Sequence, residues 1–310
     1  MISSPDGTTV LSSLGWVDKD ALWLFDAVRG ATETIPLGTG ARYASLHSDG
    51  SGRFAVAHHF DGRRLEVSVR GFSDPRIVLA HAVVADGENI ISGDSPAWQD
   101  VPLLYVEYLG FAPWKDFVLL KVLPAKGKIE VQPLGWYDDT YDKMYQGVTG
   151  VLALPDNNGA LVSVQRSSRL ILHDLATGAQ QGAIELGSRG GASKLAFRDS
   201  GKELWASDYD TVVVLRTDTW RIVRSTRLQG AGTGTQQFIG EFSFIPDQAL
   251  CAVARPFRGD VVAVDLATLK IRSSSKLGQQ PFEVAALSGG RVIARDWQTG
   301  ALLQGTLERR

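Results

Sequence analysis

The sequence contains a single cysteine, Cys251, so no pair of cysteines is available for an intrachain disulfide. A disulfide framework of the kind that holds small secreted domains together is therefore excluded. Cys251 lies in the apolar run Ala-Leu-Cys-Ala-Val at residues 249–253, without a nearby histidine or helix start that would lower the pKa of its thiol. We expect it to be a small buried residue with no redox role.

Long apolar runs and an excess of charge of one sign are also missing. No stretch approaches the roughly 18 apolar residues of a membrane span, and the start, MISSPDGTTV, lacks the basic and apolar regions of a secretory signal. The 32 Lys+Arg and 34 Asp+Glu residues leave a formal net charge of -2, which gives no footprint for nucleic acid or anionic membrane. We predict a cytoplasmic protein with neither of these partners.

What the sequence does contain is an internal repeat, in a chain that has 44% hydrophobic residues and 33 glycines. Each copy is a strand, a turn rich in Gly, Asp or Pro, a second strand, and a hairpin that ends in a short apolar run. Residues 152–178 and 244–269 are the clearest copies. Both contain the tetrapeptide Asp-Leu-Ala-Thr, at 174–177 and at 265–268, where a hairpin turn would join two apolar runs.

Weaker copies of the repeat fill the rest of the chain. We delimit the units at about residues 1–40, 41–86, 87–148, 149–190, 191–235, 236–278 and 279–310. Spacing of about 44 residues is typical of four-stranded propeller blades. The sequence therefore predicts an all-β fold, a single β-propeller domain over residues 1–310, with seven four-stranded antiparallel blades closed by strands from both termini.

The Pro-Asp-Gly turns, the Asp-Leu-Ala-Thr hairpins and the segment Gln280-Pro-Phe-Glu-Val-Ala285 resemble those of the WD40/YVTN-like propeller group, which includes bacterial quinoprotein-dehydrogenase-like propellers. The resemblance covers nearly the whole chain. The chain has no Tyr-Val-Thr-Asn tetrapeptide, and no Trp-Asp dipeptide stands at the ends of its blades. Only the reversed pair Asp296-Trp297 is present. The resemblance implies a fold rather than a function, because propellers serve as enzymes, electron-transfer subunits and scaffolds.

The sequence contains only weak candidates for catalytic or metal-binding motifs. His58 and His59 follow an apolar strand and could serve a metal or an acid/base step, but no His-x-His spacing accompanies them, so a structural role is favoured; His173, before a hairpin turn, is expected to be structural too. The cluster Asp138, Asp139 and Asp142 does not match a calcium loop. The remaining segments have ordinary explanations: an interblade loop at 229–235, which lacks the Lys of a phosphate-binding loop, and a turn at Asp208 and Asp210. We predict no cofactor, no metal and no identifiable catalytic residue.

The third unit departs from the regular spacing. Residues 87–147 are longer than the units that follow, so this blade is expected to carry added loops, and these loops are rich in aromatic residues. Tyr and Trp are enriched at the energetic centres of binding surfaces, and loops on a rigid scaffold often carry function. The predicted partner-binding residues are Trp98, Trp114, Trp136, Tyr137, Tyr141 and Tyr145. Packing of these rings over their own blade is the alternative.

Two functions follow. The first is a non-enzymatic scaffold that binds another protein through one face and the aromatic loops of the third blade. The second is an enzyme or enzyme subunit, such as a lyase, a hydrolase or a quinoprotein-type enzyme, whose site lies at the central channel and is assembled from several blades. The aromatic insertion and the lack of a catalytic motif favour the scaffold.

Overall fold

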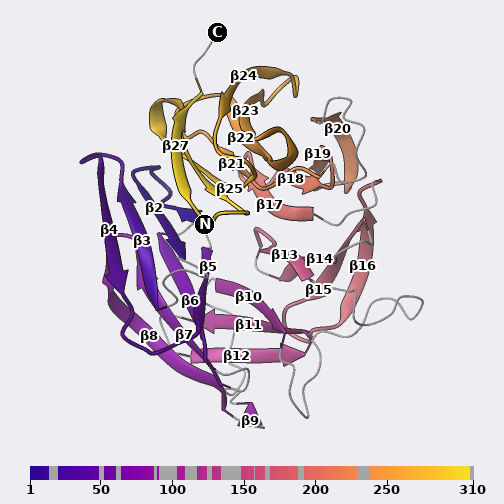
Figure 1. The fold of residues 1–310 in the computed structure, drawn as a ribbon. Coiled ribbons are helices and arrows are strands. Elements are labelled where there is room, and N and C mark those ends of the chain that lie inside the picture. The colour runs from indigo at the N-terminus through magenta and orange to yellow at the C-terminus, as the bar shows by residue number, and fades with distance from the viewer. Residues whose placement is uncertain are drawn as a thin grey trace. The chain divides into compact units, whose positions relative to one another are not determined.

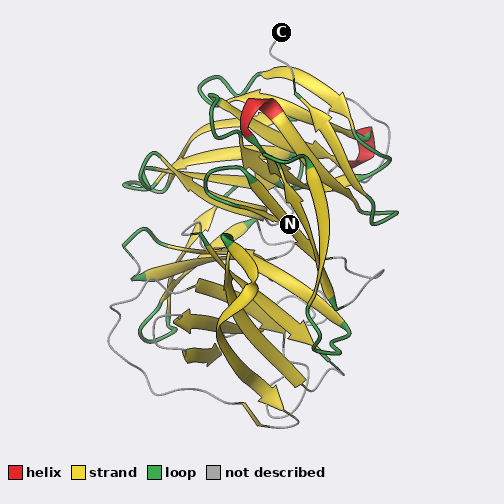
Figure 2. Cartoon of the chain, turned by 90° about the vertical axis from the view of Figure 1, so that its left-hand side faces the viewer, coloured by secondary structure: helices red, strands yellow, loops and turns green. Residues whose placement is uncertain are grey.

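The computed structural model of the chain describes residues 1–13, 20–48, 52–60, 64–86, 89–90, 103–108, 117–123, 128–133, 148–156, 158–164, 168–187, 192–228 and 238–307. The chain forms two compact units, residues 1–140 and residues 141–310, called here the N-terminal and the C-terminal unit. Strands dominate both, and the helical content of the described part is two short 3-10 turns, η3 (Pro256–Arg258) and η4 (Ser288–Gly290) (Figures 1 and 2). No described residue belongs to a helix that is long and apolar enough to cross a membrane.

The described residues of the N-terminal unit form three antiparallel sheets, each built from strands that follow one another along the chain. The first sheet has four strands: β1 (Ile2–Ser3), β2 (Thr9–Ser13), β3 (Ala21–Asp26) and β4 (Ala31–Pro36). The second has five: β5 (Tyr43–Ser48), β6 (Arg53–His59), β7 (Arg64–Gly71), β8 (Asp74–Asp86) and β9 (Asn89–Ile90). The third has three: β10 (Leu103–Tyr108), β11 (Phe117–Leu123) and β12 (Lys128–Pro133).

In the C-terminal unit, the part of the chain that the structure describes forms four antiparallel sheets, again from consecutive strands. Three have four strands each: β13 (Val148–Ala153), β14 (Gly159–Val164), β15 (Arg169–Asp174) and β16 (Gln180–Glu185); β17 (Ala192–Arg198), β18 (Glu203–Asp208), β19 (Thr211–Arg216) and β20 (Arg221–Arg227); β21 (Phe242–Phe244), β22 (Leu250–Arg255), β23 (Asp260–Asp265) and β24 (Ile271–Lys276). The last has three: β25 (Pro281–Ala286), β26 (Arg291–Asp296) and β27 (Leu302–Thr306).

The core of each unit lies between successive sheets, because the middle strands are apolar on both faces. Strand β22 is buried at every residue, and Cys251 within it is fully buried, as expected for a small apolar side chain. Burial raises the pKa of the Cys251 thiol well above its ordinary value. Trp205 of β18 packs edge to face on Phe244 of β21, with 5.4 Å between ring centroids, and so joins two neighbouring sheets.

The repeated Asp-Leu-Ala-Thr segments form hairpin turns, as predicted. The Oδ1 atom of Asp174 accepts hydrogen bonds from the amides of Ala176 and Thr177, and Asp265 Oδ1 binds Ala267 and Thr268 in the same way. The first turn joins β15 to β16 and the second joins β23 to β24. An aspartate that bonds the backbone two and three residues ahead stabilises a tight reversal, so the tetrapeptide is a structural element.

The predicted count of seven four-stranded blades closed by strands from both termini is wrong. Of the sheets that the described residues form, only five have four strands or more, and those of β10–β12 and β25–β27 have three. Each sheet takes its strands from one continuous stretch of the chain. The repeat spacing gives the distance along the chain between successive units. It does not determine how many strands within one unit pair with one another.

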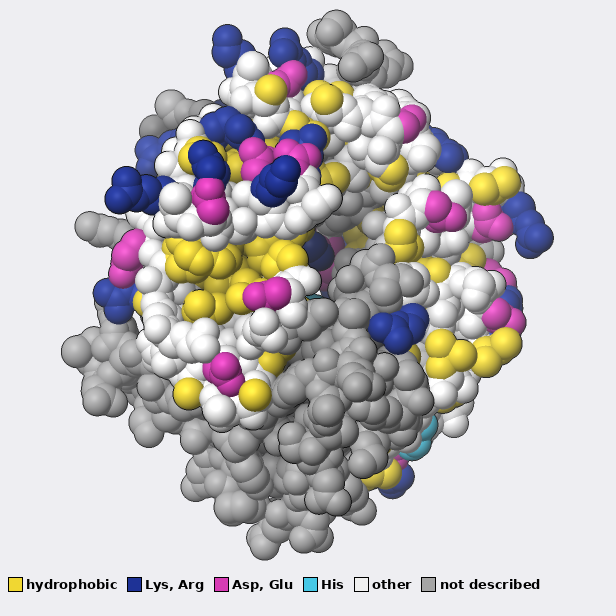
Figure 3. Space-filling model, turned by 180° about the vertical axis from the view of Figure 1, so that it is seen from behind, with side chains coloured by type: hydrophobic (Ala, Val, Ile, Leu, Met, Phe, Trp, Pro, Cys, Tyr) yellow, Lys and Arg dark blue, Asp and Glu magenta, His cyan; other side chains and the backbone are white. Residues whose placement is uncertain are grey.

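Charged side chains of both signs are mixed over the surface. On the face drawn in Figure 3, Lys and Arg side chains alternate with Asp and Glu side chains over the described part, with hydrophobic side chains gathered between them. This mixture agrees with the small formal net charge of the chain. Charge over this face thus offers no broad field of one sign for a ligand.

Candidate protein-binding surface

The aromatic residues that the sequence singled out lie outside the described residues. These are Trp98, Trp114, Trp136, Tyr137, Tyr141 and Tyr145. The described residues of the predicted third blade form the sheet β10–β12 and the short strand β9, and β9 pairs with β8 of the second sheet. Binding by these six side chains therefore stays a prediction.

A different aromatic cluster lies in the C-terminal unit. Phe238 is at its centre: its ring centroid lies 4.9 Å from that of Phe257, 5.8 Å from that of Phe282 and 5.7 Å from that of Trp297. Phe282 and Trp297 are 5.4 Å apart. Three of the four pairs meet edge to face and one is tilted, which are favourable arrangements for aromatic rings. We call these four side chains the aromatic cluster.

Four separate segments contribute to the aromatic cluster because of the sheet topology. Phe238 precedes β21, Phe257 lies in the β22–β23 connection, Phe282 is the second residue of β25, and Trp297 lies in the β26–β27 connection. Connections in an antiparallel meander alternate between the two ends of a sheet. The start of a sheet and the connection between its second and third strands therefore lie at the same end. In the sheet β21–β24 this end carries Phe238 and Phe257, and in the next sheet, β25–β27, it carries Phe282 and Trp297.

The aromatic cluster is partly open to solvent. Trp297 is 61% exposed and Phe257 is 39% exposed, whereas Phe238 and Phe282 are half-buried beneath them. Both exposed rings pack on the half-buried Phe238, and exposed apolar groups gathered in this way mark interaction sites on protein surfaces. Trp and Phe rings supply contact area with little conformational freedom to lose.

Asp296 holds Trp297 in place. Its buried carboxylate accepts hydrogen bonds at Oδ1 from the amides of Gln298 and Thr299 and at Oδ2 from the amides of Gln279 and Gln280. The Trp297 amide in turn donates to the Gln280 carbonyl at 2.8 Å. Burial raises the pKa of the Asp296 carboxyl, but the backbone amides outweigh it and keep the pKa below its ordinary value. The carboxylate thus joins the β26–β27 turn to the segment before β25.

A buried ion pair holds Phe257 in place. Arg255 donates from Nε to Asp260 Oδ1 at 2.9 Å and from a terminal nitrogen to Asp260 Oδ2 at 2.6 Å, across the η3 turn that carries Phe257. Its other terminal nitrogen donates to the Leu228 carbonyl at 3.0 Å. A bidentate pair of this kind fixes both distance and orientation.

Gly240 allows the two sheets to approach closely near Phe238 and Phe282. A Cβ atom at Gly240 would lie 2.2 Å from the Phe282 carbonyl oxygen, which is closer than van der Waals contact permits. The same carbonyl accepts a hydrogen bond from the Glu241 amide at 2.8 Å. Only glycine fits here, so this backbone contact sets the spacing of the two rings.

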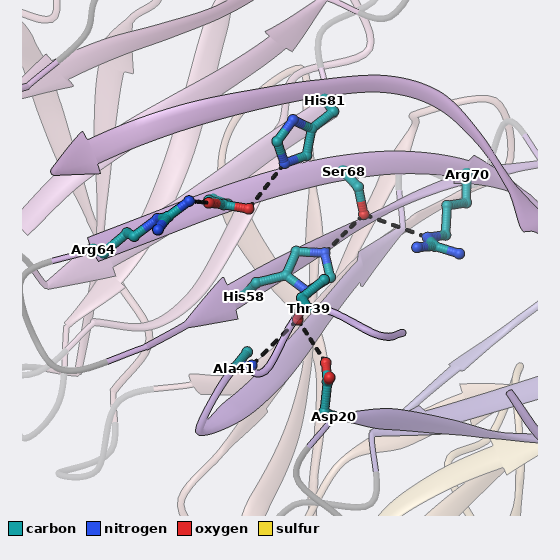
Figure 4. Close-up of polar contacts among 9 residues, drawn as sticks. Asp20, Thr39, Ala41, His58, Arg64, Ser68, Arg70 and His81 are labelled. Atoms are coloured by element: carbon teal, nitrogen blue, oxygen red, sulfur yellow. Dashed lines mark hydrogen bonds and ion pairs between the residues drawn. The ribbon is translucent and has the colours of Figure 1, made fainter. Parts of the chain in front are cut away.

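The predicted acid/base candidate His58 is part of a buried polar network in the N-terminal unit (Figure 4). One ring nitrogen, Nε2, lies 2.9 Å from Ser68 Oγ, and Nδ1 lies 3.5 Å from Thr39 Oγ1. Arg70 donates to Ser68 Oγ at 3.3 Å, and Thr39 donates to Asp20 at 2.5 Å. The network joins β6, β7 and the segment before β5. These contacts agree with the structural role that the sequence favoured for His58.

His59 points to the opposite side of β6, where Ser45 Oγ lies 3.2 Å from its Nε2. Burial lowers the pKa of both imidazoles to about 4; Arg70 adds to this effect at His58, and His58 adds to it at His59. His81 binds Glu66 at 3.0 Å beside Arg64. Among the described residues, no group of His, Cys, Asp and Glu side chains is arranged to hold a metal ion.

Other predicted positions have ordinary roles or lie outside the described residues. His173 is buried and its Nδ1 lies 3.0 Å from the Gly178 carbonyl, which agrees with a structural role. Asp208 and Asp210 flank the turn between β18 and β19, as predicted. The aspartates at 138, 139 and 142 and the Gly-rich segment 229–235 lie outside the described residues.

The sequence reasoning missed the aromatic cluster. Phe282 and Trp297 belong to segments that resemble the propeller group, and Phe238 and Phe257 belong to no motif. A signal was available: Phe238 and Phe282 are about one repeat apart, and so are Phe257 and Trp297. Aromatic residues at equivalent turn positions of neighbouring repeats fall at the same end of the sheets.

Comparisons with known proteins address the fold. No protein-family model matches the chain, and no curated protein matches it. Among solved structures, the β-propeller domain of Myceliophteria thermophila Cps50 (Swd1) is 10% identical, with a TM-score of 0.70 over 99% of this chain and 96% of that one. A chain of the mitotic checkpoint complex is also 10% identical, with a TM-score of 0.65 over 99% of this chain and 89% of that one.

These similarities confirm the predicted resemblance at the level of the fold. Identity of 10% carries no information on ligand or activity. The chain thus has the fold of a β-propeller, built from antiparallel, mostly four-stranded blades.

Proposed function

We propose that the chain is a non-enzymatic scaffold that binds another protein through the aromatic cluster of its C-terminal unit. The observation that carries this proposal is the exposure of Trp297 and Phe257 above two further rings, on a base fixed by the buried side chains of Asp296 and Arg255. Binding energy at protein interfaces concentrates in a few rigid aromatic anchors. A rigid, partly exposed group of rings has the properties of such an anchor site.

The WD40-like fold supports this proposal. One similar structure is a chain of an assembly, the mitotic checkpoint complex. Propellers present loops of successive blades at one end, and such loops are suited to recognise a partner surface. The mixed charge of the described surface in Figure 3 gives no comparable support to a nucleic acid or an anionic membrane as the partner.

We further propose that the aromatic residues of the third blade, Trp98, Trp114, Trp136, Tyr137, Tyr141 and Tyr145, bind a partner as well. Their number within one enlarged repeat is the support for this extension. We also propose a cytoplasmic location, since the lone Cys251 is buried as a free thiol and the chain contains no second cysteine.

Site-specific photo-crosslinking tests the proposed surface. The full chain carries p-benzoylphenylalanine in place of Phe257 and is expressed in its own host. Crosslinks to a distinct protein are expected there, and they should weaken when Trp297→Ala is added. The matched control carries the same photoreactive residue at Ile222, which is 41% exposed on the outer strand β20. The same crosslinks at both positions, or crosslinks that Trp297→Ala leaves unchanged, would contradict the proposal.

A further inference from the structure

We propose that the partner of the aromatic cluster presents an apolar side chain with a carboxylate beside it, so that the rings take the apolar group and Arg258 and Lys276 take the charge. This inference rests on the proposed function and specifies its ligand chemistry. It follows from the packing of the rings and from the charges on the segments that carry them.

The packing of the rings determines how a partner can bind. Phe238 touches each of the other three rings, at centroid distances of 4.9 to 5.8 Å. Rings in direct contact leave no space for a cationic group to enter between them, as an aromatic cage would require. A partner must therefore lie on top of the exposed rings of Trp297 and Phe257, which favours a flat apolar contact.

Acidic side chains on the four ring-bearing segments are already engaged. Asp260 is paired with Arg255, Glu283 with Arg295, and Glu241 with Lys194 at 3.7 Å. Asp296 is buried and accepts backbone hydrogen bonds. A cationic partner would therefore meet no available carboxylate on these segments.

The basic side chains next to the rings are in the opposite situation. Arg258 follows Phe257 directly and is exposed, and no carboxylate of the described residues forms an ion pair with it. Lys276 is also exposed, and its ammonium donates a hydrogen bond to the Arg258 backbone carbonyl, which places it beside the same turn. Two exposed basic side chains thus belong to, or bind, the turn that carries Phe257. Charge complementarity favours a carboxylate on the partner.

Peptide display on the full chain tests the inference. A library of random twelve-residue peptides on phage is selected on the wild-type chain, after depletion on Phe257→Ala/Trp297→Ala. We expect enrichment of peptides that hold Asp or Glu within a few residues of an aromatic or aliphatic side chain. For one enriched peptide, Arg258→Glu/Lys276→Glu should weaken binding by about fivefold or more, since two exposed ion pairs are lost and the reversed charges add repulsion. Raising the salt concentration should weaken wild-type binding.

The outcomes separate the two proposals. Ring-dependent peptides without acidic residues, or binding that is unchanged or improved by Arg258→Glu/Lys276→Glu, would overturn the carboxylate inference and leave the aromatic surface in place. A library that yields no peptide dependent on Phe257 and Trp297 would overturn both. Matching far-ultraviolet circular dichroism and melting temperatures of all variants would show that the losses are local to the surface.

Discussion

Arg255 and Asp260 form a bidentate, buried ion pair across the turn that carries Phe257. Removing one partner leaves an uncompensated buried charge, which typically costs 3–5 kcal/mol. Arg255→Met is therefore expected to lower the free energy of unfolding by about that amount. Arg255→Met/Asp260→Leu should lose less, because neither charge then remains. Denaturant unfolding of the two variants checks this, and an equal or larger loss in the double variant would contradict it.

Asp296→Asn should loosen the turn that carries Trp297. An asparagine has one acceptor oxygen, so either the turn amides or the amides of Gln279 and Gln280 lose their partner. We expect a loss of about 1–3 kcal/mol in the free energy of unfolding, together with weaker Trp297-dependent binding.

Asp26→Asn is the matched control for that change. Asp26 caps a similar turn through Oδ1, which binds the amides of Val28 and Arg29, and an asparagine keeps this oxygen. The expected loss is much smaller. Equal losses in the two variants, measured by urea unfolding, would show that the second set of bonds to Asp296 contributes nothing.

Gly240→Ala is expected to push the two sheets apart where Phe238 and Phe282 meet. The added Cβ atom would overlap the Phe282 carbonyl, and overpacking of this kind typically costs about 1–3 kcal/mol. Gly182→Ala is the control, because nothing lies within 4 Å of its Cβ position. A thermal shift that is the same for both variants would argue against the close approach.

Acid should destabilise the N-terminal unit through His58. Burial lowers the pKa of His58 in the folded chain to about 4, whereas the unfolded side chain titrates near 6.5. The unfolded state therefore binds more protons between these values, and stability falls as the pH is lowered through them. From pH 7 to pH 5 the expected loss is about 2 kcal/mol for this group. Urea unfolding at both pH values should show a smaller loss in His58→Gln.

Trp136→Ala/Tyr141→Ala tests the predicted surface of the third blade. If these rings are anchors for a partner, binding should weaken by about 2 kcal/mol or more while the melting temperature changes little. If they pack over the blade, removal of a buried Trp would cost about 3–5 kcal/mol of stability instead. Affinity for the crosslinked partner and thermal unfolding, measured on the same variant, distinguish the two roles.

The sequence by itself determined features that depend on neighbouring residues. The Asp174 and Asp265 turns were predictable because one carboxylate bonds amides two and three residues ahead. The burial of Cys251 followed from an apolar run on a middle strand. Repeats of this kind also predicted the propeller class, since each four-stranded unit needs a neighbour to cover its faces.

Only the tertiary structure decided which distant residues meet. Phe238, Phe257, Phe282 and Trp297 come from four segments, and they touch because consecutive sheets stack in register with Gly240 against the Phe282 carbonyl. The number of strands in each sheet likewise could not be predicted from the repeat spacing. Local hydrogen bonds are encoded within a few residues, whereas contacts between sheets depend on how close the backbones approach, and that distance is set by packing across the whole unit.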